Sequence, residues 1–238
     1  MALQPAAARV VHAFGRTDVS QVSRQRPIAD PEPRLGARHY PNFLGLEAQN
    51  VLLCDVASVL TAAPQFQPTM PRTGKPFSVA MSNCGSLGWV SDVRGYRYQA
   101  AHPATGNLWP PIPPSLLALW REVAGYRADP EACLINFYGA GAKMGSHQDR
   151  DEADFSAPVV SVSLGCAATF HVGGAKRGDP KVRYPLGSGD VFVLGGPSRL
   201  AFHGIDRVHA GTSPLDLDAV APGCQRINLT LRRVTTPV

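Results

Sequence analysis

The clearest strand pattern in the sequence is Arg226-Ile227-Asn228-Leu229-Thr230-Leu231-Arg232, close to the end of the chain. Aliphatic residues occupy its odd-numbered positions and polar residues its even-numbered ones, a period of two that is typical of a β-strand. Two interpretations of the polar face are open: it is solvated at a sheet edge, or it points into a barrel. In a barrel, Arg226 and Arg232 would require an anionic partner, because an unpaired buried charge is very costly.

Similar short apolar runs fill the second half of the chain, separated by clusters of Gly, Pro, Asp and Ser. They predict strands at 133–137, 159–164, 169–172, 182–186, 191–194, 200–202 and 227–231. Upstream, apolar stripes at helical spacing predict two helices, over 46–60 and 115–124. Two helices followed by many short strands indicate a mainly β fold with flanking helices (α+β), either a sandwich or a double-sheet jelly roll.

Composition narrows the class of protein. The chain has 238 residues, 44% of them hydrophobic and 17% charged, so it can bury a large core as one domain. Its 23 Gly and 22 Pro favour short strands joined by turns over long helices. No apolar run approaches the roughly 18 residues of a membrane span, so no membrane partner is expected. The 5 cysteines are scattered without a C-x-x-C pair, which predicts reduced thiols and a cytoplasmic protein.

The net charge of +5 is unevenly distributed along the chain. Residues 1–38 carry +3 of it and show no hydrophobic periodicity, so they are predicted to be a flexible N-terminal extension. Residues 39–238 are predicted to form a single catalytic domain. Basic charge is compatible with a polyanionic partner, but by itself it favours nucleic acid only slightly.

Aromatic residues gather in the segment 77–98, which is predicted to form a hairpin or a pair of short strands. Two interpretations of Trp89, Tyr96 and Met81 are open. They pack in the core, as aromatic and thioether side chains usually do, or they form a stacking platform for a flat ligand.

The triplet His147-Gln148-Asp149 is the strongest candidate for chemistry. In an extended segment, side chains at i and i+2 share a face, so His147 and Asp149 could bind one metal ion. His203 follows the predicted strand 200–202, about four strands later, where it could reach the same mouth of a jelly roll. Non-haem Fe(II) oxygenases hold iron with two His and one carboxylate, which leave the other coordination positions of the metal open. A lone His at a strand end is, however, more often structural.

Several motifs, in this order along 75–235, together resemble the AlkB family of Fe(II)- and 2-oxoglutarate-dependent dioxygenases. They are Asn136-Phe137-Tyr138, His147-Gln148-Asp149-Arg150-Asp151-Glu152, Pro158-Val159-Val160-Ser161-Val162-Ser163-Leu164-Gly165, Gly189-Asp190-Val191, Ser198-Arg199-Leu200, His203-Gly204-Ile205 and the stretch from Arg226 to Arg232. Upstream, Asn83-Cys84-Gly85-Ser86-Leu87-Gly88-Trp89 and Arg94-Gly95-Tyr96 resemble the family's nucleotide-recognition lid, placed here at 77–98. Residues 1–38 have no counterpart.

The resemblance implies a double-stranded β-helix core over 133–235 and a set of site residues. His147, Asp149 and His203 would be both the metal ligands and the catalytic centre. The family's 2-oxoglutarate-binding set matches Asn136, Tyr138, Arg226, Asn228 and Arg232. The expected substrate-side residues are Met81, Trp89, Tyr96, Asp151, Ser161 and Arg177.

The implied reaction is oxidative dealkylation of bases such as N1-methyladenine and N3-methylcytosine. Fe(II) is the cofactor; 2-oxoglutarate and O₂ become succinate and CO₂, and the alkyl carbon leaves as an aldehyde. The expected partner is single- or double-stranded DNA, and the expected state is a monomer. Alternatives are the same chemistry on RNA such as tRNA, or on a small molecule. A metal-free, cupin-like binding module is a further alternative, which the intact His/Asp/His set and both arginines disfavour.

Overall fold

The computed structural model describes residues 36–237, so most of the predicted N-terminal extension lies outside the described residues. The boundary predicted after residue 38 needs correction, because Arg38 already belongs to strand β1 (Arg38–Tyr40). This strand pairs antiparallel with β10 (Val191–Leu194), so the ordered fold begins before residue 39. The two predicted helices are present as α1 (Leu46–Ala62) and α2 (Pro114–Val123).

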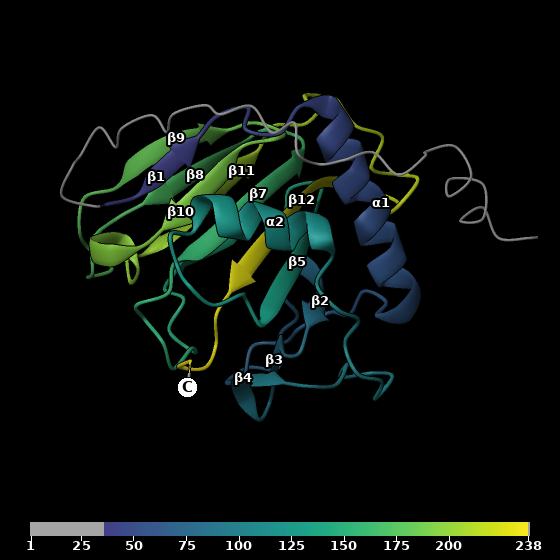
Figure 1. The fold of residues 1–238 in the computed structure, drawn as a ribbon, viewed down its shortest axis with the longest axis horizontal. Coiled ribbons are helices and arrows are strands. Elements are labelled where there is room, and N and C mark those ends of the chain that lie inside the picture. Colours follow the sequence, from purple (N-terminus) through teal and green to yellow (C-terminus); the bar gives the residue numbers. More distant parts are fainter. Residues whose placement is uncertain (1–35, 238) are drawn as a thin grey trace, which may run out of the picture.

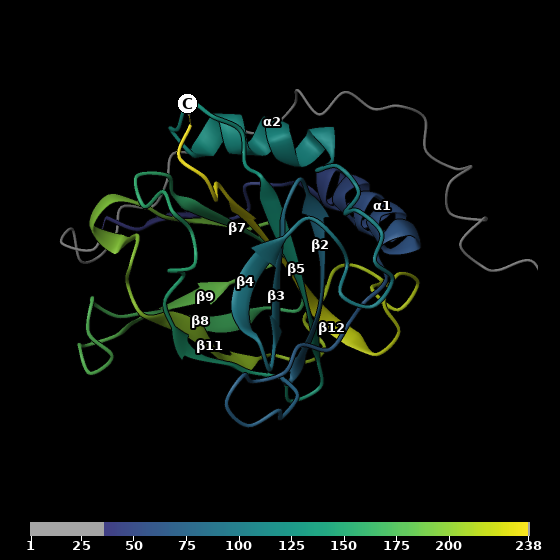
Figure 2. The same ribbon diagram turned by 90° about the horizontal axis from the view of Figure 1, so that it is seen from below.

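Two antiparallel sheets face each other in a jelly roll, and the two helices cover the outer face of the larger one (Figures 1 and 2). The six-stranded sheet has the order β1-β10-β7-β12-β5-β2. Its further strands are β2 (Val79–Gly85), β5 (Ala132–Gly139), β7 (Val159–Gly165) and β12 (Cys224–Arg232). The four-stranded sheet has the order β6-β11-β8-β9. Its strands are β6 (Met144–His147), β8 (Ala168–Val172), β9 (Val182–Leu186) and β11 (His203–Val208).

Strand β12 lies in the middle of the large sheet, between β7 and β5. Its odd-numbered residues, Ile227, Leu229 and Leu231, are fully buried against the helices in one core cluster. Its even-numbered residues therefore face the small sheet, because side chains alternate across a strand. Arg226 is 0% exposed and Arg232 is 6% exposed. The solvated-edge interpretation of this strand is wrong.

The structure corrects two parts of the predicted strand pattern. Residues 200–202 are not a strand: a short 3-10 turn, Gly196–Ser198, precedes them, and Phe202 exchanges backbone hydrogen bonds with Gly173 and Gly174 in a loop. His203 therefore begins strand β11 and does not end an earlier one. Strands β1 and β6 were not predicted, because neither carries an alternating apolar pattern.

The predicted lid segment 77–98 divides between two structures. Its first part is β2, an edge strand of the large sheet. Only β3 (Gly88–Asp92) and β4 (Gly95–Gln99) form a separate two-stranded hairpin, which projects beside β2 below the barrel in Figure 1. We call β3–β4 the hairpin below. Among residues 36–237, no helix is long and apolar enough to cross a membrane.

Candidate active site

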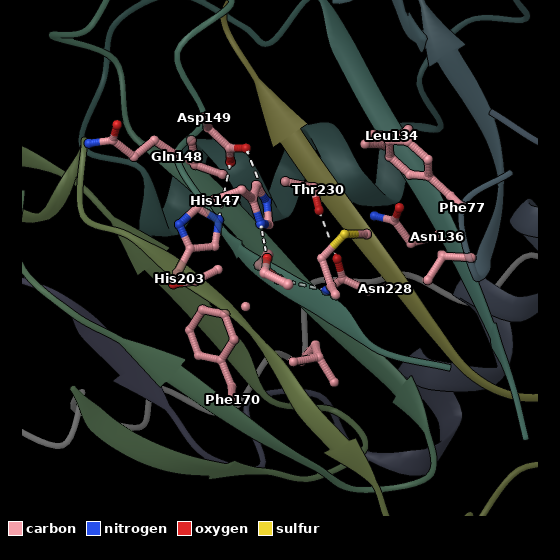
Figure 3. Close-up of a pocket in the computed structure, with 18 of the residues that line it drawn as sticks. Phe77, Leu134, Asn136, His147, Gln148, Asp149, Phe170, His203, Asn228 and Thr230 are labelled. Atoms are coloured by element: carbon pink, nitrogen blue, oxygen red, sulfur yellow. Dashed lines mark hydrogen bonds and ion pairs between the residues drawn. The ribbon is translucent and has the colours of Figure 1, made fainter. Parts of the chain in front are cut away.

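A cavity of about 550 Å³ opens between the two sheets. Apolar side chains from both sheets line its interior, among them Leu134, Phe170 and Phe192, and the hairpin borders it. The polar face of β12 forms one wall, and β6 with β11 forms the opposite one. Figure 3 shows His147, Asp149 and His203 converging at one end of this cavity, with Asn136 and Asn228 farther along it.

The strand pairing brings the three predicted metal ligands together. His147 ends β6 and His203 begins β11, and the two residues are directly paired in the sheet. Asp149 follows two residues after β6. One ligand atom from each of the three side chains lies within 4.8 Å of the others.

Neighbouring groups orient each of these side chains for a metal ion. The Nδ1 atom of His147 lies 2.9 Å from the Gly145 carbonyl, and that of His203 lies 2.9 Å from the Ala201 carbonyl, so Nε2 of each ring is free to bind. The Oδ1 atom of Asp149 accepts a hydrogen bond from Arg232 at 2.8 Å, whereas its Oδ2 atom is buried without a hydrogen-bond partner. Two imidazole nitrogens and one free carboxylate oxygen fit the facial arrangement that Fe(II) takes.

The protonation states suit a cation. Burial lowers the pKa of His203 to about 4, so this imidazole is neutral at pH 7. Burial would raise the pKa of Asp149, but the Arg232 guanidinium, together with smaller contributions from His203, His147 and Arg199, outweighs burial and holds the pKa well below its usual range. Both side chains are therefore in the state that binds a metal ion.

The other end of the polar wall lacks a partner for its positive charge. Arg226 donates to the Ser163 hydroxyl at 2.6 Å and to the Cys166 carbonyl at 2.8 Å, both of them neutral acceptors. Its Nε atom and the Oδ1 atom of Asn136 are buried without a hydrogen-bond partner. Burial lowers the pKa of Arg226 to about 10, so it is still a cation at pH 7. A buried cation beside unpaired polar atoms fits an anionic ligand such as a dicarboxylate.

The remaining predicted cosubstrate residues lie on the same wall. Tyr138 is buried on β5, opposite Arg226 in the sheet, and burial raises its pKa to about 12. Asn228 donates to the Ser161 hydroxyl at 2.6 Å and accepts from Thr230 at 2.8 Å. Ser161, predicted on the substrate side, therefore stands beside the cosubstrate residues.

Arg232 belongs to a buried ion network that the sequence did not reveal. Besides Asp149, it donates to the Tyr98 hydroxyl at 3.2 Å and lies 3.6 Å from the Glu152 carboxylate. Glu152 also pairs with Arg199 at 3.1 Å, and Tyr98 donates to it. Arg199 in turn donates to the Asp149 carbonyl at 2.7 Å. Charged residues are seldom buried, so no sequence pattern marked Glu152 and Arg199 as interior.

The hairpin places a flat aromatic surface at the cavity mouth. The rings of Trp89 and Tyr96 are stacked, with centroids 5.6 Å apart and planes 18° apart. Trp89 Nε1 donates to the Asp151 carboxylate at 2.8 Å. Tyr96 is 50% exposed, so core packing is the wrong interpretation for it. Met81 is 1% exposed and packs in the core between the sheets, while also lining the cavity.

Arg177, also predicted on the substrate side, stands at the rim of the cavity. It donates to the Ser146 carbonyl at 2.6 Å, and its guanidinium lies over the Phe202 ring, 4.8 Å from the centroid. All the site residues predicted from the sequence therefore line this cavity.

Comparison with known proteins decides the family. The sequence pattern of the 2OG-Fe(II) oxygenase superfamily matches residues 36–232. The AlkB homolog of Caulobacter vibrioides, an alpha-ketoglutarate-dependent dioxygenase, is 52% identical over 199 residues, which is 83% of this chain and 87% of that protein. The chain belongs to the AlkB family. AlkB of Escherichia coli is 46% identical over 190 residues, covering 78% of this chain and 85% of that protein.

A solved structure agrees with this membership. OsALKBH1 superposes with a TM-score of 0.68 at 29% identity, covering 89% of this chain and 99% of that chain. Membership in the AlkB family confirms the predicted jelly-roll fold and the enzyme class, an Fe(II)- and 2-oxoglutarate-dependent dioxygenase that uses O₂. It also excludes the non-catalytic binding module left open by the sequence.

Proposed function

We propose that this AlkB-family dioxygenase dealkylates cationic bases of the N1-methyladenine and N3-methylcytosine type in DNA. The observation that carries the proposal is the placement of the stacked Trp89–Tyr96 pair and the Asp151 carboxylate at the mouth of the cavity that holds His147, Asp149 and His203. A flat cationic ring fits between an aromatic face and a carboxylate, because both attract positive charge.

Different side chains around the cavity are proposed to bind the metal, bind the cosubstrate and exclude water. Fe(II), 2-oxoglutarate and O₂ together supply the oxidation of an N-alkyl carbon, after which the hydroxylated group leaves as an aldehyde. His147, Asp149 and His203 would hold the metal, and Arg232 hydrogen-bonds one Asp149 oxygen, which leaves the other as the candidate ligand atom. Arg226, with Asn136, Tyr138 and Asn228, would bind the cosubstrate. Apolar neighbours such as Phe170 exclude water from this space, which strengthens each charged contact.

The target base must leave its stack to enter such a site, because an N-alkyl group inside a duplex is out of reach. Trp89 and Tyr96 offer a stacking surface for the base, worth roughly 1–3 kcal/mol per base. Arg177 at the rim offers a charged donor for a phosphate. Single- or double-stranded DNA is therefore the proposed partner, with RNA as the second candidate. The Arabidopsis thaliana relative named DNA N(6)-methyladenine demethylase ALKBH1A is 44% identical over 91 residues, which favours DNA.

We further propose a monomer in the cytoplasm. All 5 cysteines are unpaired thiols, as a reducing compartment requires. The cavity is lined by residues of this one chain, so a second copy is not needed to complete it.

One set of oligonucleotides tests the proposal. Purified protein with Fe(II), ascorbate and 2-oxoglutarate is given matched DNA and RNA strands that carry N1-methyladenine, N3-methylcytosine or no lesion. Succinate, formaldehyde and the restored base are measured together. We expect all three products in stoichiometric amounts from methylated DNA. Turnover only on RNA, or succinate without a restored base on any strand, would overturn the DNA proposal.

A further inference from the structure

The outer face of the small sheet carries a chain of hydrogen bonds that the proposed reaction does not use. It runs from Ser146 on β6 through His171 on β8 to Asp206 on β11. The Nδ1 atom of His171 lies 2.8 Å from Asp206 Oδ1, and its Nε2 atom lies 3.1 Å from the Ser146 hydroxyl. Arg183 on β9 donates to the other Asp206 oxygen at 3.0 Å. Side chains from all four strands of the sheet are therefore connected.

The protonation state fixes the direction of these bonds. The pKa of His171 is lowered, chiefly by burial, despite the opposing attraction of Asp206. The ring is therefore neutral at pH 7. A neutral ring beside a carboxylate keeps its proton on Nδ1 and donates it to Asp206. Its Nε2 atom then accepts the hydrogen bond of the Ser146 hydroxyl. The Ser146 carbonyl is also held, since Arg177 donates to it at 2.6 Å.

A glycine in β11 makes the hydrogen bond between His171 and Ser146 possible. Strand β11 lies between β6 and β8, so the His171 ring must pass over Gly204 to meet Ser146. A Cβ atom at Gly204 would lie 3.0 Å from His171 Cε1 and 2.5 Å from the Met144 carbonyl oxygen. Any larger residue would push the imidazole and β6 apart.

Strand β6 needs such support, because its own pairing is weak. It has four residues, lies at the sheet edge, and its register with β11 shifts between His203 and Ile205. Its last residue is His147, whose side chain is 39% exposed, against 9% for His203 and 6% for Asp149. The most exposed of the three metal-site side chains thus ends a short edge strand with an irregular register.

We propose that His171 is a positioning residue that, through Ser146, holds the end of β6 so that His147 faces His203 at the distance a metal ion needs. This inference rests on the proposed function, because it takes His147 to be a metal ligand. The order Ser–His–Asp also resembles a nucleophilic triad, but His171 is 3% exposed and has no free face for a substrate. Its role is therefore to hold the strand and not to take a proton in a reaction.

The test measures the affinity of the apo protein for a metal ion. Co(II), whose visible absorption reports its coordination, is titrated into the apo forms of the full chain and of His171→Leu, Ser146→Ala and the double variant. Loss of an outer partner of a metal ligand costs about 10- to 100-fold in affinity. We expect the lower part of that range for each single variant, with no further loss in the double variant. We also expect an altered Co(II) spectrum.

Two controls separate the possible outcomes. Thr169→Val removes another side-chain hydrogen bond of β8, that to His209, and should leave Co(II) affinity unchanged. His147→Ala should lose most Co(II) binding. If the unmodified chain and His147→Ala bind alike, the metal assignment itself fails. If His147→Ala loses binding while His171→Leu and Ser146→Ala bind as the unmodified chain does, only the positioning role is overturned. Losses in those two variants that simply add in the double variant would also overturn it.

Discussion

The two ends of strand β12 carry the same residue in different electrostatic surroundings. At one end, Arg232 is balanced: two cations, Arg232 and Arg199, face two anions, Asp149 and Glu152, and all four side chains are at most 7% exposed. At the other end, Arg226 is fully buried, and no carboxylate of the described residues lies within 4 Å of it. Two arginines that look equivalent in the sequence are therefore not equivalent in the fold.

The difference favours the Arg226 end as the place where an anionic cosubstrate would bind. A buried charge is tolerated when it is paired, so the charges at the Arg232 end are balanced, although Arg232 Nε makes no hydrogen bond, and this arginine acts mainly by holding Asp149. At the Arg226 end, a negative group in the cavity would supply the anionic partner that the described residues do not provide. We infer that Arg226 provides most of the binding energy for the cosubstrate and that Arg232 provides stability and metal geometry. Four predictions test this contrast, given in decreasing order of the change we expect.

The largest effect belongs to the metal site at the Arg232 end. His203→Ala, His147→Ala and Asp149→Ala each remove one of three protein ligands, so each should abolish turnover to succinate. Metal affinity should fall by more than the roughly 100-fold that loss of an outer partner costs. Isothermal titration with Mn(II) and the circular dichroism of the folded protein provide the measurements. Full activity in any of the three would show that this end does not hold the metal.

The second effect is on stability. Arg232→Met leaves Asp149 and Glu152 short of a cation and should reduce the free energy of unfolding by about 3–5 kcal/mol, measured by urea denaturation. Arg226→Met, at the other end, should cost far less, because it removes a charge that has no anionic partner. Glu152→Gln added to Arg232→Met should restore part of the loss. Equal destabilisation by the two Met variants would contradict the contrast.

The third effect is on the cosubstrate. Arg226→Met removes a charge-assisted hydrogen bond worth roughly 1.5–3 kcal/mol, so the KM for 2-oxoglutarate should rise about 10- to 150-fold. The rise is measured under saturating metal, with Arg226→Lys as the variant that keeps the charge and should retain part of the affinity. An unchanged KM would mean that the anion binds elsewhere on the wall.

The smallest effect concerns the carboxylate outside the buried network. Asp151 holds Trp89 at the mouth and is exposed, so its charge is available to a substrate. Asp151→Asn should lower kcat/KM for cationic N1-methyladenine about 2- to 5-fold more than for neutral N1-methylguanine, as expected for an exposed ion pair. An equal fall in kcat/KM on both bases would show that Asp151 only holds the hairpin in place and does not select a cationic base.

The sequence predicted the strand β12 well, because alternation identifies a strand and its two faces. It left open whether the polar face was solvated, because a period of two does not say what lies opposite each face. The partners of Arg232 could not be predicted, since Glu152 and Arg199 are 80 and 33 positions away and reach it only through the fold. Strand β6, which reads Met144-Gly145-Ser146-His147, had no apolar alternation to find. The metal ligands could be predicted because His147-Gln148-Asp149 and His203 belong to an ordered set of motifs that resembles the AlkB family, whereas each motif alone is weak evidence.

The separate hairpin affects how the substrate range of this protein can evolve. It forms its own small sheet, and two side-chain contacts tie it to the site, Trp89 with Asp151 and Tyr98 with Glu152. Val90 in the core and the hydrogen bonds of Asn83 with the Trp89 backbone fix it to the rest of the fold. Exposed hairpin positions can vary without disturbing the barrel sheets, so the substrate range can evolve or be engineered by grafting the hairpin, provided that the graft keeps these anchoring residues.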